Sequence, residues 1–164
     1  MCVRAMSFSY GPASYAAAEV LAVPRALLEE TFASMRSCGD GKMECVVLWT
    51  GPLGGPEQVD AVVAPPHRAT RAGYIIEPAW VTGFYAELRR SRRTTRAQVH
   101  THPGANVEHS GIDEDFPLVA VPGFMSIVLP WFATRDISLD GAAVYEFKSK
   151  GWVRRQVCDV ISWT

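Results

Sequence analysis

The stretch from Val99 to Asp113, Val-His-Thr-His-Pro-Gly-Ala-Asn-Val-Glu-His-Ser-Gly-Ile-Asp, constrains the fold of this chain more than any other. His100 and His102 are one residue apart, and side chains at that spacing point to the same face of an extended strand. Pro103 ends the strand, because it has no N–H to donate to a neighbour. We therefore expect a strand over 97–102 that presents two imidazoles on one side.

Three side chains of this stretch match the ligand set of a catalytic zinc ion. Gly104 lets the chain turn after the strand, so that the carboxylate of Asp113 can join the imidazoles of His100 and His102. Three protein ligands that leave one position open for water are typical of hydrolytic zinc sites. Asp113 is expected in the first turn of a short helix over 113–119, where the helix dipole favours a carboxylate. The residues alone thus predict one Zn²⁺ per chain and a hydrolytic reaction.

Length and composition restrict the class of protein. With 164 residues, 48% of them hydrophobic, we expect a single domain over 1–164 with an irregular N-terminal arm over 1–18. The net charge of −1 gives no overall attraction to nucleic acid or to an anionic membrane. No apolar segment reaches the length that spans a bilayer.

The cysteines indicate a location. The chain has four of them, without a Cys-x-x-Cys pair. Cys45 lies in an apolar run and is expected to be a buried free thiol. We expect no disulfide, and a reducing, cytoplasmic location.

The hydrophobic pattern predicts interleaved helices and strands. Amphipathic helices are expected over 24–37 and 78–90, where apolar residues recur every three or four positions after a proline. Runs rich in β-branched and apolar residues predict strands. These strands cover 19–23, 43–49, 58–64, 74–76, 97–102, 124–129, 143–147 and 152–157. Hairpins are expected from 43–49 with 58–64 and from the last two strands, which predicts an α/β layered domain with a mixed sheet flanked by helices.

Several charged residues allow two interpretations each. Glu44 begins a predicted buried strand, so it is either a solvent-facing end residue, which its position alone favours, or a group placed there for chemistry. His109 either orients Ser110 or is a solvated loop residue, and we favour the loop. His67 lies among prolines and has no evident partner. The five arginines between Arg89 and Arg96 either solvate a helix end or dock an acidic partner.

Together these residues resemble the JAMM motif of the JAB/MPN metalloprotease family, in which a glutamate precedes His-Ser/Thr-His-Pro, six residues and Ser-x-x-Asp. The likeness covers 44–137, and Cys-Val-Val follows Glu44 where many members carry a glycine. The compact chain and the pair His109-Ser110 look most like the prokaryotic JAB type associated with bacterial ubiquitin-like conjugation systems. No motif position is missing, and the matching residues are Glu44, His100-Thr101-His102-Pro103, Ser110 and Asp113.

The resemblance implies a cytidine-deaminase-like layered fold and a zinc-dependent peptidase, with zinc on His100, His102 and Asp113. Glu44 would act as general base and acid. Ser110 would donate a hydrogen bond to the oxyanion or position the water. The implied substrate is a ubiquitin-like protein or its conjugates, cleaved after the C-terminal glycine. Further implied partners are E1-like and E2-like enzymes of an antiviral defence pathway.

The expected specificity rests on a narrow groove that admits an extended, small-residue tail, added as a strand to a sheet edge. We expect the groove walls at 65–73 and 104–108, the segments that flank the metal strand in sequence order. The arginines over 89–96 are candidates for steering an acidic face of the substrate.

Other functions compete with this one. A non-catalytic JAB-like scaffold would have lost ligands, whereas all five functional positions of the motif are present. A zinc nucleobase deaminase needs His-x-Glu and Pro-Cys-x-x-Cys, which this sequence lacks. The near-neutral net charge and the absence of a recognition motif argue against nucleic-acid binding through the arginines. We therefore expect no nucleic-acid and no membrane partner.

Overall fold

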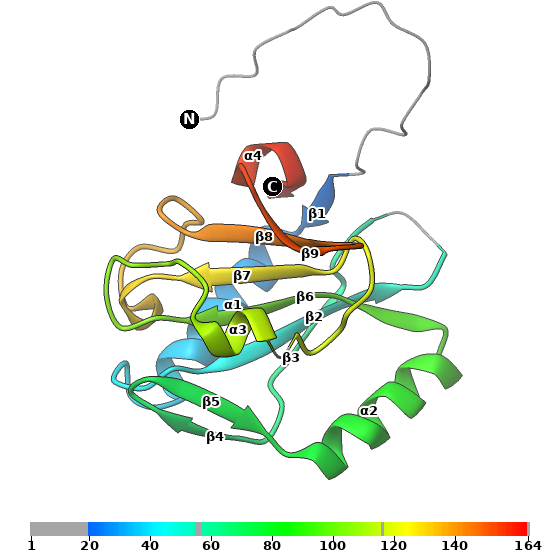
Figure 1. Ribbon diagram of the computed structural model, residues 1–164, viewed down its shortest axis with the longest axis horizontal. Coiled ribbons are helices and arrows are strands. Elements are labelled where there is room, and N and C mark those ends of the chain that lie inside the picture. Colours follow the sequence, from blue (N-terminus) through cyan, green and yellow to red (C-terminus); the bar gives the residue numbers. More distant parts are fainter. Residues whose placement is uncertain (1–19, 55–56, 116, 164) are drawn as a thin grey trace, which may run out of the picture.

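A mixed β-sheet forms the centre of the molecule, as the computed structural model in Figure 1 shows. The structure describes residues 20–54, 57–115 and 117–163. The irregular arm expected over 1–18 lies outside these residues. Within them, no helix is long and apolar enough to cross a membrane.

The central sheet has six strands in the order β3-β2-β6-β7-β8-β9. β6 and β7 run parallel, and every other neighbouring pair is antiparallel. This confirms the predicted mixed sheet and both predicted hairpins, β2 with β3 and β8 with β9. The strands are β2 (Val46–Pro52), β3 (Ala61–Val63), β6 (Arg93–Thr101), β7 (Met125–Leu129), β8 (Ala143–Lys148) and β9 (Gly151–Arg155).

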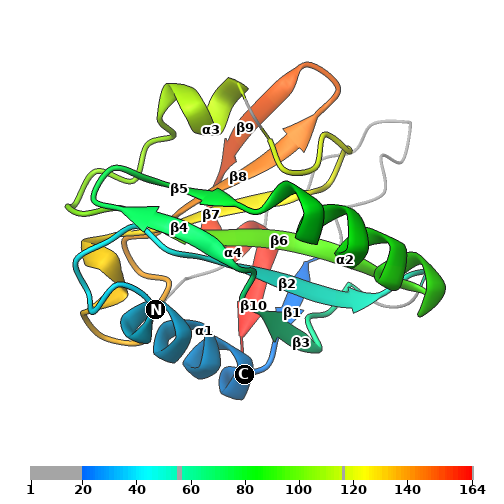
Figure 2. The same cartoon turned by 90° about the horizontal axis from the view of Figure 1, so that it is seen from below.

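Two long helices flank the sheet, as predicted. α1 (Arg25–Ser37) begins directly after Pro24, and α2 (Pro78–Arg90) has the predicted bounds. α1 lies against one face of the sheet and α2 runs alongside β6 (Figures 1 and 2). The α/β class is therefore confirmed.

Smaller elements complete the fold. Two short strand pairs lie outside the central sheet: β1 (Leu21–Val23) parallel to β10 (Ile161–Trp163), and β4 (His67–Thr70) antiparallel to β5 (Gly73–Ile76). The remaining pieces are α3 (Gly111–Asp115), a 3-10 turn η1 (Trp131–Ala133) and α4 (Val157–Val160).

Several elements differ from the prediction. α3 begins before Asp113 and ends at Asp115 instead of 119, because Pro117 has no N–H to continue helical hydrogen bonding. The strand predicted over 152–157 ends at Arg155, where α4 follows. β4 and β10 were not predicted, since each is short and depends on a partner strand that local sequence does not reveal.

Side-chain alternation divides the central sheet into two faces. One face packs on α1 and the β1–β10 pair, and the indole N–H of Trp49 donates to the hydroxyl of Thr31 at 2.8 Å across this contact. The opposite face carries His100 and the cluster around Tyr145, and α3 lies over it (Figure 2). The core on the α1 side includes Leu28, Phe32, Met35, Val47, Trp49, Val99, Ile127 and Leu129.

Cys38 and Cys45 form a disulfide bond. The expectations of a chain without a disulfide and of a free thiol at Cys45 are therefore wrong. Cys38 follows α1 directly, and the turn at Gly39, Asp40 and Gly41 has a positive φ at all three residues. This left-handed turn reverses the chain within a few residues, so the two sulfurs meet although the spacing of the cysteines alone gives no sign of it.

Candidate metal centre

The three residues predicted as zinc ligands come together on one face of the sheet. One ligand atom from each of His100, His102 and Asp113 lies within 4.8 Å of the others. Nε2 of His100 is 3.4 Å from Oδ1 of Asp113, and Nε2 of His102 is 3.8 Å from Oδ2 of the same carboxylate. β6 supplies the imidazole of His100, the residue directly after β6 supplies that of His102, and α3 supplies the carboxylate.

Main-chain hydrogen bonds fix the metal strand and the residue after it. His100 pairs with Val46 of β2 and Val128 of β7, on either side of β6. The N–H of His102 donates to the carbonyl of Leu129 at 2.9 Å. Nδ1 of His102 lies 3.1 Å from the carbonyl oxygen of Asn106, which accepts its proton and leaves Nε2 to face Asp113.

His100 has the environment of a metal ligand. Its side chain is fully buried, and neither ring nitrogen has a hydrogen-bond partner among the described residues. Burial lowers the pKa of His100 to about 3, although the carboxylate of Asp113 opposes the shift. A buried, neutral imidazole without a partner is costly. A cation on Nε2 removes that cost, so the donor set of two imidazoles and a carboxylate fits a zinc ion.

Asp113 is kept ionised by its neighbours. Burial alone would raise its pKa, but hydrogen bonding to His102, the proximity of His100 and two hydrogen bonds from Ser110 outweigh it, so the pKa lies well below the usual range of a carboxyl group. The backbone N–H of Ser110 donates to Oδ2 at 2.8 Å and its hydroxyl donates to the same oxygen at 2.7 Å. The carboxylate of Asp113 is therefore anionic and can bind a cation.

Glu44 is buried next to these residues, not solvent-facing. Its N–H donates to the carbonyl of Thr70 in β4 at 2.7 Å, which fixes the start of the strand against the β4–β5 pair. Burial raises the pKa of Glu44, His102 lowers it in part, and Asp113 raises it further. A carboxylate with a raised pKa beside a candidate metal site suits a general base.

Glu44, His102, Ser110 and Asp113 line a pocket of about 650 Å³. Its other wall is mostly apolar and comes from β5, α2 and α3, with Tyr74, Ile75, Ile76, Val81 and Ile112. The predicted wall at 65–73 contributes only its end, at Arg71, Ala72 and Gly73.

The predicted wall at 104–108 is wrong, because no residue of this segment lines the pocket. The segment packs elsewhere. Val107 is buried beside Tyr145, and the carbonyl of Gly104 accepts a hydrogen bond from the N–H of Trp131 at 3.1 Å.

Comparison with known proteins adds to this geometry. No family model matches the chain. The chain is 29% identical over 135 residues to a probable metalloprotease, y4jG, of Sinorhizobium fredii, and the match covers 79% of this chain and 83% of that protein. The solution structure of DSY2949 from Desulfitobacterium hafniense is similar with a TM-score of 0.64 and 15% identity, covering 88% of this chain and 93% of that one.

A further solved structure indicates the fold family. AF2198 from Archaeoglobus fulgidus, a JAB1/MPN domain protein, is similar with a TM-score of 0.51 and 15% identity, covering 87% of this chain and 98% of that one. The chain is a JAB/MPN-fold protein. This is the fold that the JAMM pattern predicted, and the similarity to a probable metalloprotease supports the same resemblance.

His109 has a structural place in this JAB/MPN fold, and its interpretation as a solvated loop residue is wrong. Its side chain is only 1% exposed, and its ring stacks on Tyr145 with centroids 3.7 Å apart. The carboxylate of Glu114 only accepts, so Nδ1 of His109 donates to it and Nε2 accepts from the hydroxyl of Ser126, which in turn accepts from the side-chain amide of Gln98. This chain of hydrogen bonds anchors the residue before Ser110. A histidine directly before the motif serine was the only signal for it.

A left-handed turn, η1, supports the metal loop from the other side. Trp131, Phe132 and Ala133 have φ angles of 57°, 52° and 55°. Each such residue costs roughly 1–2 kcal/mol when it is not glycine. The turn directs the N–H of Phe132 to the carbonyl of His102 at 2.8 Å. Nothing in the sequence predicted this support.

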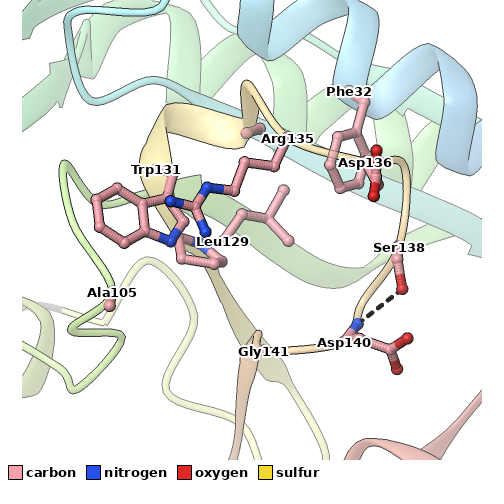
Figure 3. Close-up of a pocket in the computed structure, with 11 residues that line it drawn as sticks. Phe32, Ala105, Leu129, Trp131, Arg135, Asp136, Ser138, Asp140 and Gly141 are labelled. Atoms are coloured by element: carbon pink, nitrogen blue, oxygen red, sulfur yellow. Dashed lines mark hydrogen bonds between the residues drawn. The ribbon is translucent and has the colours of Figure 1, made fainter.

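The same turn borders a second pocket, of about 350 Å³ (Figure 3). The guanidinium of Arg135 lies over the ring of Trp131, 4.0 Å from its centroid, and Asp136 and Asp140 lie on the opposite side. None of the motif residues lines this pocket.

The arginines at the end of α2 and in the segment that follows it divide into two groups. Arg96, whose side chain is 11% exposed, pairs with Glu57 and donates to the carbonyl of Pro52. Arg93 pairs with Asp60. These two arginines brace the β2–β3 edge, and the three that remain exposed are Arg89, Arg90 and Arg92.

Proposed function

We propose that this JAB/MPN-fold chain is a zinc-dependent peptidase or isopeptidase that cleaves after the C-terminal glycine of a ubiquitin-like protein. The observation that carries the proposal is that His100, His102 and Asp113 form one cluster of ligand atoms, and that His102, Asp113 and Glu44 line the same pocket. The similarity to a probable metalloprotease supports the reaction class. We further propose that residues 1–164 act as a single domain.

The residues of the pocket divide the work of hydrolysis. A zinc ion on His100, His102 and Asp113 supplies, when bound, a Lewis acid that polarises the scissile carbonyl and makes water more acidic. Glu44 removes a proton from the attacking water and gives it to the leaving amine as the C–N bond breaks. Its raised pKa suits both steps, because the carboxyl group must accept and release the proton near neutral pH.

Ser110 lines the same pocket and acts on the same reaction. Its hydroxyl donates to Asp113, and a rotation about the Cα–Cβ bond redirects that hydrogen bond toward the pocket. In that orientation it would stabilise the negative charge that develops on the carbonyl oxygen. Ser110 thus has two duties in this proposal, positioning a ligand and binding an oxyanion.

The pocket walls favour an extended tail with small side chains at its end. Ile75 and Ile112 are 59% and 65% exposed, which is unusual for large apolar side chains and suits contact with a partner. β5 pairs only with β4 among the described strands, so its other edge can accept a strand from the substrate. The tail would then reach the metal with its last glycine.

We place this reaction in the cytoplasm, in a bacterial ubiquitin-like conjugation pathway of antiviral defence with E1-like and E2-like enzymes. The residues His109-Ser110 and the compact chain support this part of the proposal. Neighbouring genes for these enzymes and for a ubiquitin-like protein are the expected observation.

A fusion substrate tests the proposal. A cognate ubiquitin-like protein is joined to a reporter through its C-terminal glycine, and a matched fusion carries a bulky residue at that position. We expect cleavage of the first fusion only, with loss on chelation and in Asp113→Asn, which should also lose zinc by elemental analysis. Equal cleavage of both fusions would reject the glycine specificity. If the chain neither cleaved the fusion nor bound stoichiometric zinc, it would be a JAB-like scaffold.

A further inference from the structure

A second group of donor atoms lies outside the motif and outside its pocket. Cys38, Cys45 and His67 each offer one ligand atom, and these atoms lie within 4.8 Å of one another. Cys38 directly follows α1, Cys45 directly precedes β2 and His67 begins β4. Three elements therefore direct two sulfurs and an imidazole to one point, and the proposed peptidase reaction uses none of them.

His67 is oriented as metal-binding histidines are. Its Nδ1 lies 2.7 Å from the carbonyl oxygen of Pro65. That oxygen only accepts, so Nδ1 carries the proton and Nε2 has a free lone pair. Nε2 lies 3.2 Å from Sγ of Cys38. A disulfide sulfur has no proton to donate, so this contact is not a hydrogen bond while the disulfide is intact. A ring N–H fixed by a backbone carbonyl is the usual outer partner of a metal-binding imidazole.

We propose that in the reduced chain Cys38, Cys45 and His67 bind one thiophilic divalent cation such as Zn²⁺, and that the disulfide is the metal-free, oxidised form of this site. A cellular dithiol reduces the bond, giving two electrons and two protons to the cysteines and becoming a disulfide itself. The cation then displaces both thiol protons. Two thiolates balance its charge, and the fourth position of a tetrahedral site stays open.

The surroundings allow the two forms to interconvert. Zinc binds thiolates at about 2.3 Å, so two sulfurs on one ion must lie farther apart than in a disulfide. The turn between the cysteines contains exposed residues, Asp40, Lys42 and Met43, and can adjust to that separation. Cys45 itself is anchored, because its N–H donates to the hydroxyl of Thr101 at 3.0 Å. The N–H of Cys38 likewise donates to the carbonyl of Ser34 at 3.0 Å, so the separation of the sulfurs changes by rotation of the cysteine side chains.

Cobalt binding to the full chain tests the proposal. Only a thiolate ligand gives the near-ultraviolet sulfur-to-cobalt charge-transfer band, and the motif site has no sulfur ligand. We expect the chain reduced with a phosphine, which competes for metal less than a dithiol does, to bind two Co²⁺ and show this band. The oxidised chain should bind one Co²⁺ without the band.

Variants separate this site from the motif site. Cys38→Ser, Cys45→Ser and His67→Gln should each lose one equivalent of Co²⁺ and, with it, the band. Cys158→Ser is the matched control and should behave as the unaltered chain. Asp113→Asn should keep the band while losing the other equivalent, so failure of the proposed peptidase site leaves this test intact.

Two outcomes would overturn the proposal. One is a reduced chain with two reactive thiols at Cys38 and Cys45 that binds a single Co²⁺ without the charge-transfer band. The other is an unchanged band in His67→Gln together with unchanged affinity. Circular dichroism of each variant establishes that it has folded, and His67→Gln leaves both sulfurs in place if a serine variant fails to fold.

Discussion

Ser110 donates both its hydroxyl and its backbone N–H to one oxygen of Asp113, Oδ2, at 2.7 and 2.8 Å. The other oxygen, Oδ1, faces Nε2 of His100 at 3.4 Å. A residue expected to stabilise an oxyanion thus also positions a metal ligand. Because the two hydrogen bonds fix the carboxylate, the geometry of the cation site depends on Ser110.

Ser110→Ala is expected to weaken zinc binding as well as catalysis. Loss of such a partner of a ligand typically lowers metal affinity by about 10–100-fold. Competition with a chromophoric chelator measures the affinity, and Ser91→Ala, at the end of α2, is the control. Unchanged zinc affinity with a lower kcat would instead mean that Ser110 stabilises the oxyanion and does not position the metal ligand.

Glu44→Gln should retain zinc and the fold but lose turnover, because the amide keeps the shape of the side chain and cannot accept the proton. Loss of general acid–base catalysis costs on the order of 100-fold to 10,000-fold in rate. Steady-state cleavage of the fusion substrate and elemental analysis of the same sample are the measurements. Activity close to that of the unaltered chain would return Glu44 to a purely structural role.

Acidification should destabilise the metal-free protein. The folded-state pKa of His100 is lowered by burial from 6.5 to about 3, so the unfolded chain binds a proton in this interval that the folded chain does not. Stability from this residue is therefore present above pH 6.5 and is lost as the pH falls toward about 3. The pKa of Asp113 is also lowered in the folded chain. Its contribution to stability is therefore likewise lost as the pH falls below the usual pKa range of a carboxyl group.

Other groups oppose this trend. The pKa values of His102 and Glu44 are raised in the folded chain. Their contributions to the free energy of unfolding therefore fall as the pH rises through their folded-state pKa values. We expect His100 to dominate, because it is fully buried. Urea unfolding of the metal-free chain across this pH range measures the slope, and His100→Gln should flatten it. An equal slope in the variant would assign the effect to other groups.

His109→Ala should destabilise the fold and disturb the motif segment. It leaves the hydroxyl of Ser126 and the carboxylate of Glu114 without their partner and removes the ring stacked on Tyr145. A loss of about 1–3 kcal/mol in the free energy of unfolding is expected for a buried group left unsatisfied. Chemical denaturation measures it, with the exposed Glu108→Ala as control. A change within about 0.5 kcal/mol, as at ordinary surface sites, would contradict the anchoring role.

Local geometry made part of this protein predictable. The spacing of His100 and His102 sets their common face through the alternation of a strand, and the helices α1 and α2 follow from apolar periodicity. The ligand types alone restrict the cation chemistry. The mixed sheet also follows from the order in which helix and strand patterns alternate along the sequence. These inferences need only contacts within a segment or between neighbouring segments.

Only the tertiary structure decided the features that join distant segments. The burial of Glu44 depends on the β4–β5 pair, and the disulfide between Cys38 and Cys45 depends on a left-handed turn. His109 is buried because Tyr145 and Ser126 lie beneath it. Burial and hydrogen-bond partners are properties of the packed chain, because they depend on which remote residues approach. For that reason the ligands of the candidate site were predictable from the sequence, whereas their supports were not.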